Sequence, residues 1–340
     1  MKFNSGYLLV WLTILLVGFA STSCDSNEFN YENNPHGNFD ALWTILDKNY
    51  CFFEYKNIDW DSVRLSYRPR VTPNMNNDAL FKLMGEMLSE LRDGHVNLMA
   101  SHDVSRYWSW KEEYPSNFNI DIVDKYLSTD YSIASSMKYK ILEDNVGYIY
   151  YGSFSNDASN SGLNQILNRL AICNGIILDV RNNGGGSLSN VDRIASRFFN
   201  ERTLVGYISH KIGTGHNDFS DLYTKYIESS KQIRYQKPLY IITNRGCYSA
   251  TNEFVSTMKY APRVTVVGDK TGGGSGFPFS SELPNGWSVR FSTSPTFNAE
   301  KQHIEFGVEP DVKLDMKYSD INEMKDTYIE YARREINQSR

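Results

Sequence analysis

The stretch Gly175-Ile-Ile-Leu-Asp-Val-Arg-Asn-Asn-Gly-Gly-Gly186 joins a short apolar run to a turn built of asparagine and glycine. An apolar run bounded by turn residues predicts a strand that is buried on both faces. Apolar residues at helical spacing follow the turn, namely Val191, Ile194, Ala195 and Phe198. The stretch therefore predicts a strand, a turn and a helix in that order.

The same order of elements recurs on both sides of this stretch. Val146-Gly-Tyr-Ile-Tyr-Tyr151 predicts a strand and is followed by a helical pattern over residues 160–171. Pro238-Leu-Tyr-Ile-Ile-Thr243 predicts a buried strand before a helix near 250–260, and Val264-Thr-Val-Val267 predicts another strand. Because repeated strand, turn and helix imply parallel pairing, the fold class is α/β.

The residues before this core have a different character. Segments 38–50 and 78–91 carry apolar residues spaced for one face of a helix, and Asp78 is placed to cap the second. We therefore expect four regions: a helical N-terminal subdomain over 38–100, an irregular connecting segment over 101–140, an α/β core over 141–315 and a C-terminal helix over 316–340.

The N-terminus has the features of an export signal. Lys2 precedes an apolar run of about 14 residues, 7–20, which is short of the roughly 20 residues that span a bilayer. Small residues then lead to Cys24, an order that resembles a bacterial lipoprotein box, although Ser21 stands where such boxes usually carry leucine. The resemblance implies a signal peptide over 1–23, a lipid anchor on Cys24, a flexible tether over 24–37 and a place in the cell envelope. A plain secretory signal is the alternative.

Composition excludes some classes of partner. The formal net charge is -5 and no run of Lys and Arg occurs, so nothing indicates a nucleic-acid partner. The other cysteines, Cys51, Cys173 and Cys247, cannot all pair with one another, and their spacings match no metal motif. We therefore expect neither a metal nor an organic cofactor.

Ser249 is the candidate nucleophile, because it lies between a predicted strand and a predicted helix. A serine at such a turn presents its hydroxyl at the carboxyl edge of the sheet, where α/β proteins build their sites. The N–H of Ala250, at the helix N-terminus, and the glycines at 184–186 are suited to hold an oxyanion. By itself the turn also fits a serine that only caps the helix, and Cys247 is an alternative nucleophile.

Two further segments carry groups that a serine nucleophile needs. His95 is the candidate general base, because the pKa of histidine lies near neutral, and His102 is the alternative. Glu305 is the candidate for the carboxylate that orients the histidine, with Glu309 and Asp311 as alternatives.

Taken in order, these segments resemble the S41 peptidase family, which includes the C-terminal processing peptidases and the tricorn core proteases. The resemblance covers roughly residues 38–315. Its motifs are Asp93-Gly-His95, Gly147-Tyr-Ile149, Leu178-Asp-Val-Arg-Asn-Asn-Gly-Gly-Gly186, the turn at Ser249, Gly268-Asp-Lys-Thr-Gly272, Leu283-Pro-Asn-Gly286 and Gly307-Val-Glu-Pro-Asp311. It implies a spiralling α/β core of the ClpP/crotonase type that hydrolyses peptide bonds in peptide or protein substrates.

The family activates its serine in two ways. Processing peptidases use a lysine in a Thr-x-Gly-Lys segment, but here Gly274 holds the lysine position and Lys270 comes before the motif. The tricorn-like branch uses a histidine and a glutamate, and His95 and Glu305 stand at the matching places. One departure is Gly94, where that branch has a serine before its histidine.

The resemblance thus implies Ser249, His95 and Glu305 as catalytic residues, with the N–H groups of Gly185 and Ala250 as the oxyanion hole. About 45 residues separate the predicted helical region from the core, fewer than the complete PDZ domain of many processing peptidases needs, so we expect none. Two rival interpretations stay open: a catalytically inactive peptide- or ligand-binding envelope lipoprotein of the same fold, and a Ser–Lys enzyme that uses Lys270.

Overall fold

The computed structural model describes residues 31–338. The predicted signal peptide and Cys24 lie outside the described residues. The predicted tether, 24–37, overlaps a helix, because α1 (Pro35–Asn49) begins inside it, with the side chain of Asn34 accepting the Gly37 N–H at 2.8 Å as a cap. No helix between residues 31 and 338 has both the length and the apolar character that crossing a membrane requires.

A seven-stranded sheet forms the core, in the order β13-β9-β8-β5-β4-β3-β2. Its strands are β2 (Ser132–Ala134), β3 (Met137–Ile141), β4 (Gly147–Tyr150), β5 (Ile176–Asp179), β8 (Leu239–Thr243), β9 (Val264–Gly268) and β13 (Val312–Lys313). From β4 to β13 all neighbours pair in parallel, whereas β2, β3 and β4 pair antiparallel. The predicted α/β core with parallel strands is therefore confirmed.

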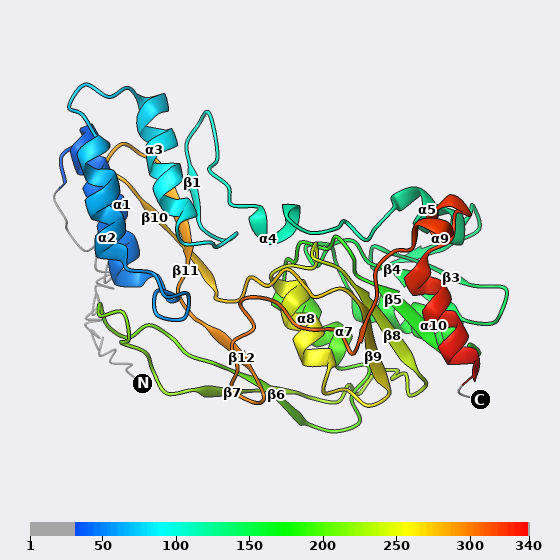
Figure 1. Ribbon diagram of the computed structural model, residues 1–340. Coiled ribbons are helices and arrows are strands. Elements are labelled where there is room, and N and C mark those ends of the chain that lie inside the picture. The colour runs from blue at the N-terminus through cyan, green and yellow to red at the C-terminus, as the bar shows by residue number, and fades with distance from the viewer. Residues whose placement is uncertain (1–30, 339–340) are drawn as a thin grey trace, which may run out of the picture.

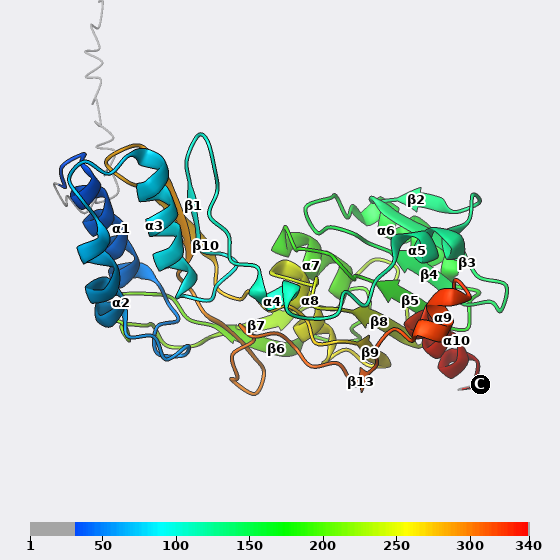
Figure 2. The same ribbon diagram turned by 45° about the horizontal axis from the view of Figure 1, so that its top comes forward.

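Helices cover both faces of this sheet (Figures 1 and 2). Three helices, α6 (Asn160–Leu170), α7 (Leu188–Ala195) and α8 (Ala250–Met258), share one cluster of buried apolar residues with Leu178 and Ile241. On the opposite face α5 (Ile120–Leu127) and α10 (Thr327–Gln338) share another with Ile177 and Ile242. Because alternate strand residues point to opposite faces, burial on both sides accounts for the unbroken apolar runs.

The helical N-terminal subdomain is a lobe at the far end of the molecule from α10 (Figure 1). Its helices are α1, α2 (Trp60–Tyr67), the short 3-10 helix η1 (Arg68–Arg70) and α3 (Asn77–Ser89), and they pack on a sheet ordered β1 (Asn97–Met99), β11 (Ser288–Ser292) and β10 (Pro278–Glu282). The helices α1 and α3 lie where the apolar spacing predicts them, whereas α2 and η1 were not predicted. The boundary at 100 needs correction, because the apolar faces of α1 and α3 are covered in part by Val289 and Phe291 from the segment assigned to the core.

A third sheet, ordered β12 (Thr296–Asn298), β6 (Thr203–Ile208) and β7 (Tyr223–Ile227), runs along one side of the molecule, between the lobe and the core (Figure 1). Residues 101–140 are more regular than expected, since they contain α4 (Ser109–Glu112), α5, β2 and β3. Because β3 pairs with β4, the core begins before residue 141. Within the described residues, no PDZ fold lies between β1 and β4.

The connecting segment is held to the sheet through its backbone carbonyls. Arg245 donates to the carbonyl of Trp110 at 2.7 Å, and Asn244 donates to that of Ser116 at 2.8 Å. Both donors lie in the turn after β8, next to Ser249. These bonds join a polar segment without clear local pattern to the carboxyl edge of the sheet, where the candidate nucleophile lies.

The C-terminal region forms two helices rather than the single one expected over 316–340. The helix α9 (Tyr318–Asn322) ends before α10 starts at Thr327. The side chain of Asp326 accepts the backbone N–H groups of Tyr328 and Ile329 at 3.0 and 3.1 Å, so it caps α10 and fixes the break between the two helices.

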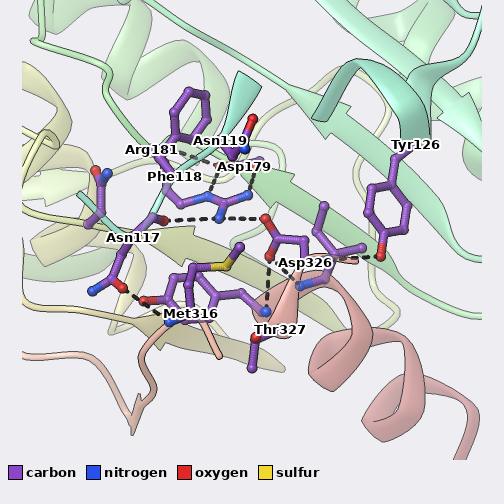
Figure 3. Close-up of polar contacts among 12 residues, drawn as sticks. Asn117, Phe118, Asn119, Tyr126, Asp179, Arg181, Met316, Asp326 and Thr327 are labelled. Carbon is purple, nitrogen blue, oxygen red and sulfur yellow. Dashed lines mark hydrogen bonds and ion pairs between the residues drawn. The ribbon is translucent and has the colours of Figure 1, made fainter. Parts of the chain in front are cut away.

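A fully buried ion cluster fixes α10 to the end of β5 (Figure 3). The guanidinium of Arg181 pairs with Asp179 at 2.6 Å and with Asp326 at 2.8 Å, and it donates to the carbonyl of Asn117 at 3.2 Å. One cation thereby joins β5, the connecting segment and the C-terminal helix, and the glycine turn starts at the next residue.

We expect Arg181→Met to lower the free energy of unfolding by about 3–5 kcal/mol, because it leaves two buried carboxylates without their cation. Urea denaturation followed by circular dichroism measures the change. The matched control is Arg334→Met, which removes an exposed ion pair with Glu335 and is expected to change stability by less than about 1 kcal/mol. Equal effects of the two substitutions would contradict the structural role of the cluster.

Candidate active site

Ser249 occupies the turn between β8 and α8 with a backbone conformation that is rare for a residue with a side chain. Its φ is 58° and its ψ is -122°, which costs energy and persists only where the surroundings impose it. Its N–H donates to the carbonyl of Gly273 at 2.8 Å, and the N–H of Tyr248 donates to that of Asn183 at 3.1 Å. The hydroxyl of Ser249 makes no capping bond to α8, so the interpretation as a mere helix cap does not hold.

Ser249 and His95 line the same cavity, which has a volume of about 530 Å³. His95 comes from the N-terminal lobe, Ser249 and Ala250 from the start of α8, and Gly186 from the glycine turn. Parts of β6, β7, β11 and the loop 274–278 complete the walls. Residues from the two smaller sheets, from α7 and α8 and from the turns of the core thus converge on one concave site of the size that ligand sites commonly have.

His95 is buried and electrically neutral at ordinary pH. Burial lowers the pKa of its imidazole to about 4, and the nearby charge of Asp93 opposes that shift only in part. The backbone N–H of His95 donates to Asp93 at 2.8 Å, whereas Nδ1 of the ring has no hydrogen-bond partner among residues 31–338. No hydrogen bond joins the ring to Ser249 in this structure; such bonds are often loose in a free enzyme and tighten only with substrate.

Glu305 lies close to this pair but bonds to other residues. Its carboxylate contacts Lys56 at 2.7 Å and accepts the Ser275 N–H at 2.8 Å, and it makes no contact with the His95 ring among the described hydrogen bonds. Burial raises the pKa of Glu305 to about 7. The positive charge of Lys56 opposes this shift, and the negative charge of Asp93 adds to it. Ser275 lines the cavity beside His95, so one residue separates the predicted glutamate from the predicted base.

Lys56 and Asp93 are the site residues that sequence reasoning missed. Lys56 is completely buried and bridges Glu305 and Asp93, the latter at 3.6 Å. Burial alone would lower the pKa of Lys56, but the two carboxylates raise it, so the amine stays charged. Asp93 stood in the motif with His95 and could have been named, whereas a lone lysine among aromatic residues gives no signal.

The glycine turn packs directly against the serine turn. A Cβ on Gly185, whose φ is +100°, would lie 2.8 Å from both the nitrogen of Ala250 and the Cβ of Ser249. The Gly185 N–H, predicted as an oxyanion donor, donates to the side chain of Asn183 at 3.0 Å. Within residues 31–338, neither Ala250 nor Gly186 uses its N–H in a hydrogen bond, and both line the cavity.

The Ser–Lys interpretation has no geometric support. Lys270 pairs with Glu309 at 3.0 Å and does not line the cavity. At Gly274, which replaces the family's lysine, a Cβ would lie 2.3 Å from the ring of Tyr248, so no side chain fits there. The absence of a lysine at position 274, noted from the sequence, therefore has a steric reason.

His102, Asp311 and Cys247 do not line the cavity either. His102 is exposed, stands 3.7 Å from Asp78 and packs on Phe81. Asp311 pairs with Lys259 and accepts the Val266 N–H. Burial raises the pKa of Cys247 to about 12, which keeps its thiol protonated and unreactive.

Comparisons with known proteins bear on the family and the fold. The family model of peptidase family S41 matches residues 145–314, and that of the tricorn protease C1 domain matches residues 31–89. A candidate peptidase from Parabacteroides merdae, known from a crystal structure, is 51% identical, with a TM-score of 0.87 over 90% of this chain and 97% of that one.

More distant proteins share parts of the sequence or the fold. The carboxy-terminal processing protease CtpA of Bacillus subtilis is 22% identical over 188 residues, which is 54% of this chain and 37% of that relative. The chain therefore spans well under half the length of this curated relative. Mature CPAF, 14% identical, has the same fold, with a TM-score of 0.66 over 88% of this chain and 95% of that one. With the first family model matching half of its residues, the chain belongs to peptidase family S41.

Proposed function

We propose that this protein is a serine-type peptidase in which Ser249 attacks a peptide carbonyl and His95 accepts its proton. The observation that carries the proposal is the unbonded hydroxyl of Ser249, held in a strained turn in the same cavity as a neutral, buried histidine. The attack forms a tetrahedral intermediate, His95 passes the proton to the leaving amine, and an acyl-enzyme remains on Ser249. His95 then deprotonates the water molecule that hydrolyses the acyl-enzyme.

The oxyanion requires donors that are free before the reaction. The N–H of Ala250 meets this condition at the positive end of α8. For the second donor, the prediction from the sequence is Gly185, but its N–H already donates to Asn183. Gly186 is the better-placed donor, because its N–H is unengaged and it lines the cavity.

Glu305 acts in this proposal as a positioning residue. Its contact with the Ser275 N–H fixes the loop that packs beside His95, and its negative charge favours the imidazolium that forms during attack. Lys56 holds Glu305 in place. Its positive charge also offsets the repulsion between the buried carboxylates of Glu305 and Asp93. The arrangement differs from a triad in which the carboxylate bonds to the histidine ring.

The proposed location is the cell envelope, with a lipid anchor on Cys24. Its support is the order of charged, apolar and small residues before that cysteine. The substrates would be peptides or proteins. The rival, a non-catalytic binding protein, has one observation in its favour, the missing hydrogen bond between Ser249 and His95, and covalent labelling of the serine separates the two.

A fluorophosphonate probe is expected to label the wild type and not Ser249→Ala. His95→Ala should slow labelling by about 10²-fold or more, because a general base is lost. Lys270→Ala, the control that also tests the Ser–Lys interpretation, should be labelled at the wild-type rate. Labelling of Ser249→Ala would contradict the proposal, and so would labelling of His95→Ala at the wild-type rate.

The rate of labelling should fall as the pH drops from 8 to 6, because the pKa of Glu305 is raised to about 7 and protonation removes the charge that supports His95. A second fall should come only near pH 4, where His95 itself becomes protonated. In Glu305→Gln we expect a rate about tenfold lower at pH 8, equivalent to about 1.4 kcal/mol, and no change between pH 8 and 6. The control Glu309→Gln should keep the wild-type profile; persistence of the upper step in Glu305→Gln would assign it elsewhere.

Gly185→Ala should reduce labelling at least about tenfold, since its Cβ would press on Ser249 and Ala250 and its φ is unfavourable for alanine. The matched control is the neighbouring Gly184→Ala, where a Cβ meets no atom within 4 Å. Similar rates for the two variants, at equal thermal stability, would show that the glycine turn does not shape the nucleophile.

A further inference from the structure

Arg290 is a cation without a partner in the candidate active site. It lies on β11, is half-buried, and lines the cavity together with Ser249 and His95. Among residues 31–338, its guanidinium takes part in no hydrogen bond or ion pair. A guanidinium left in a concave site without a carboxylate is unusual, because charged side chains in such places are normally paired.

The other charged side chains of the cavity make no ion pair with Arg290, because both carboxylates contact Lys225 instead. Lys225 contacts Glu253 at 2.7 Å and Asp192 at 3.9 Å, and all three line the cavity. They come from β7, α8 and α7, whereas Arg290 comes from the sheet of the N-terminal lobe. One wall thus carries a paired cluster and the other a free positive charge.

The pairing of β1 with β11 places Arg290 on the histidine side of the cavity. Arg290 is the antiparallel partner of Asn97, which follows His95 by two residues. Its charge also reaches His95, where it adds to the lowering of the pKa by burial, and Tyr248, where burial outweighs it and raises the pKa. Both observations place the guanidinium near the general base rather than near the glycine turn.

In peptide hydrolysis, the histidine side of the site receives a particular part of the substrate. The histidine that takes the proton of the serine must give it to the leaving amine, so the leaving part of the peptide lies beside the histidine. A guanidinium there faces the residues that follow the scissile bond. Its planar array of N–H donors matches a carboxylate, which it can bind through two parallel hydrogen bonds.

We propose that Arg290 binds a carboxylate on the leaving part of the substrate, within the first residues after the scissile bond. The proposal rests on the peptidase function proposed above and adds a substrate class to it. The carboxylate has two sources: the C-terminus of the peptide, in which case the protein removes short C-terminal fragments, or an Asp or Glu side chain.

The test uses a library of randomised decapeptides made twice, once with a free C-terminal carboxylate and once with a C-terminal amide. Wild type, Arg290→Gln and Arg290→Lys digest both libraries, and mass spectrometry locates every cut. The control Arg169→Gln removes an exposed charge on α6, outside the cavity. Because the guanidinium of Arg290 makes no hydrogen bond or ion pair among residues 31–338, neither substitution removes a polar side-chain contact of the fold.

With the wild type we expect a bias of about tenfold to a hundredfold, the size of a hydrogen-bonded charge pair. A bias toward cuts near a free C-terminus that the amide library lacks identifies the terminal carboxylate. A bias toward Asp and Glu just after the cut, in both libraries, identifies the side chain. Arg290→Gln should lose the bias, Arg290→Lys should keep part of it, and Arg169→Gln should keep all of it. Unbiased cutting by the wild type, or a bias that survives in Arg290→Gln, overturns the proposal.

A binding measurement separates this proposal from the proposed function. Ser249→Ala and Ser249→Ala/Arg290→Gln are incubated with both libraries, and retained peptides are counted by mass spectrometry. If the wild type cuts nothing but Ser249→Ala retains carboxylate-bearing peptides through Arg290, the peptidase function fails and carboxylate recognition stands. If the wild type cuts peptides and retention is the same with and without Arg290, the function stands and the role of Arg290 is refuted.

Discussion

The backbone strain at Ser249 is the constraint on which the site depends. A left-handed φ at a residue with a side chain is unfavourable, so the surroundings must hold it. Two parallel strands and their turns do this: Gly273, after β9, accepts the Ser249 N–H, and Asn183, after β5, accepts that of Tyr248. The hydroxyl of Ser249 makes no capping bond to α8, which supports the nucleophile proposed for this residue over a capping serine.

The ends of β5 and β8 are themselves fixed by polar contacts from distant segments. The buried Arg181 joins β5 to the C-terminal helix, and Asn183 connects the glycine turn to α8 by accepting the hydroxyl of Thr251 at 2.7 Å. Asn244 and Arg245 bind the connecting segment over the same edge. Because these groups are buried and paired, loss of one partner leaves a charge or dipole without compensation. The edge of the sheet that carries Ser249 is thus held by buried polar contacts on the core side.

The lobe side contributes the charged groups. His95, Asp93 and Lys56 come from the N-terminal lobe, and Glu305 reaches them from the chain beyond β12. Two carboxylates around one buried lysine leave a net negative charge, and burial makes one of them take up a proton near neutral pH. Burial lowers the pKa of His95 and keeps its ring neutral over most of the pH range, which suits the role of general base proposed for it.

The sequence by itself determined the parallel core, since strand and helix periodicity are local, and it indicated Ser249, His95 and Glu305 through the resemblance to the S41 family. It also excluded a lysine at Gly274. Only the tertiary structure decided that Ser249 and His95 share a cavity, that Glu305 bonds to Lys56 and Ser275, and that the lobe borrows β10 and β11 from residues 278–292. Those facts depend on contacts between residues far apart in the chain, and neither apolar spacing nor a motif records which distant side chain meets a buried charge.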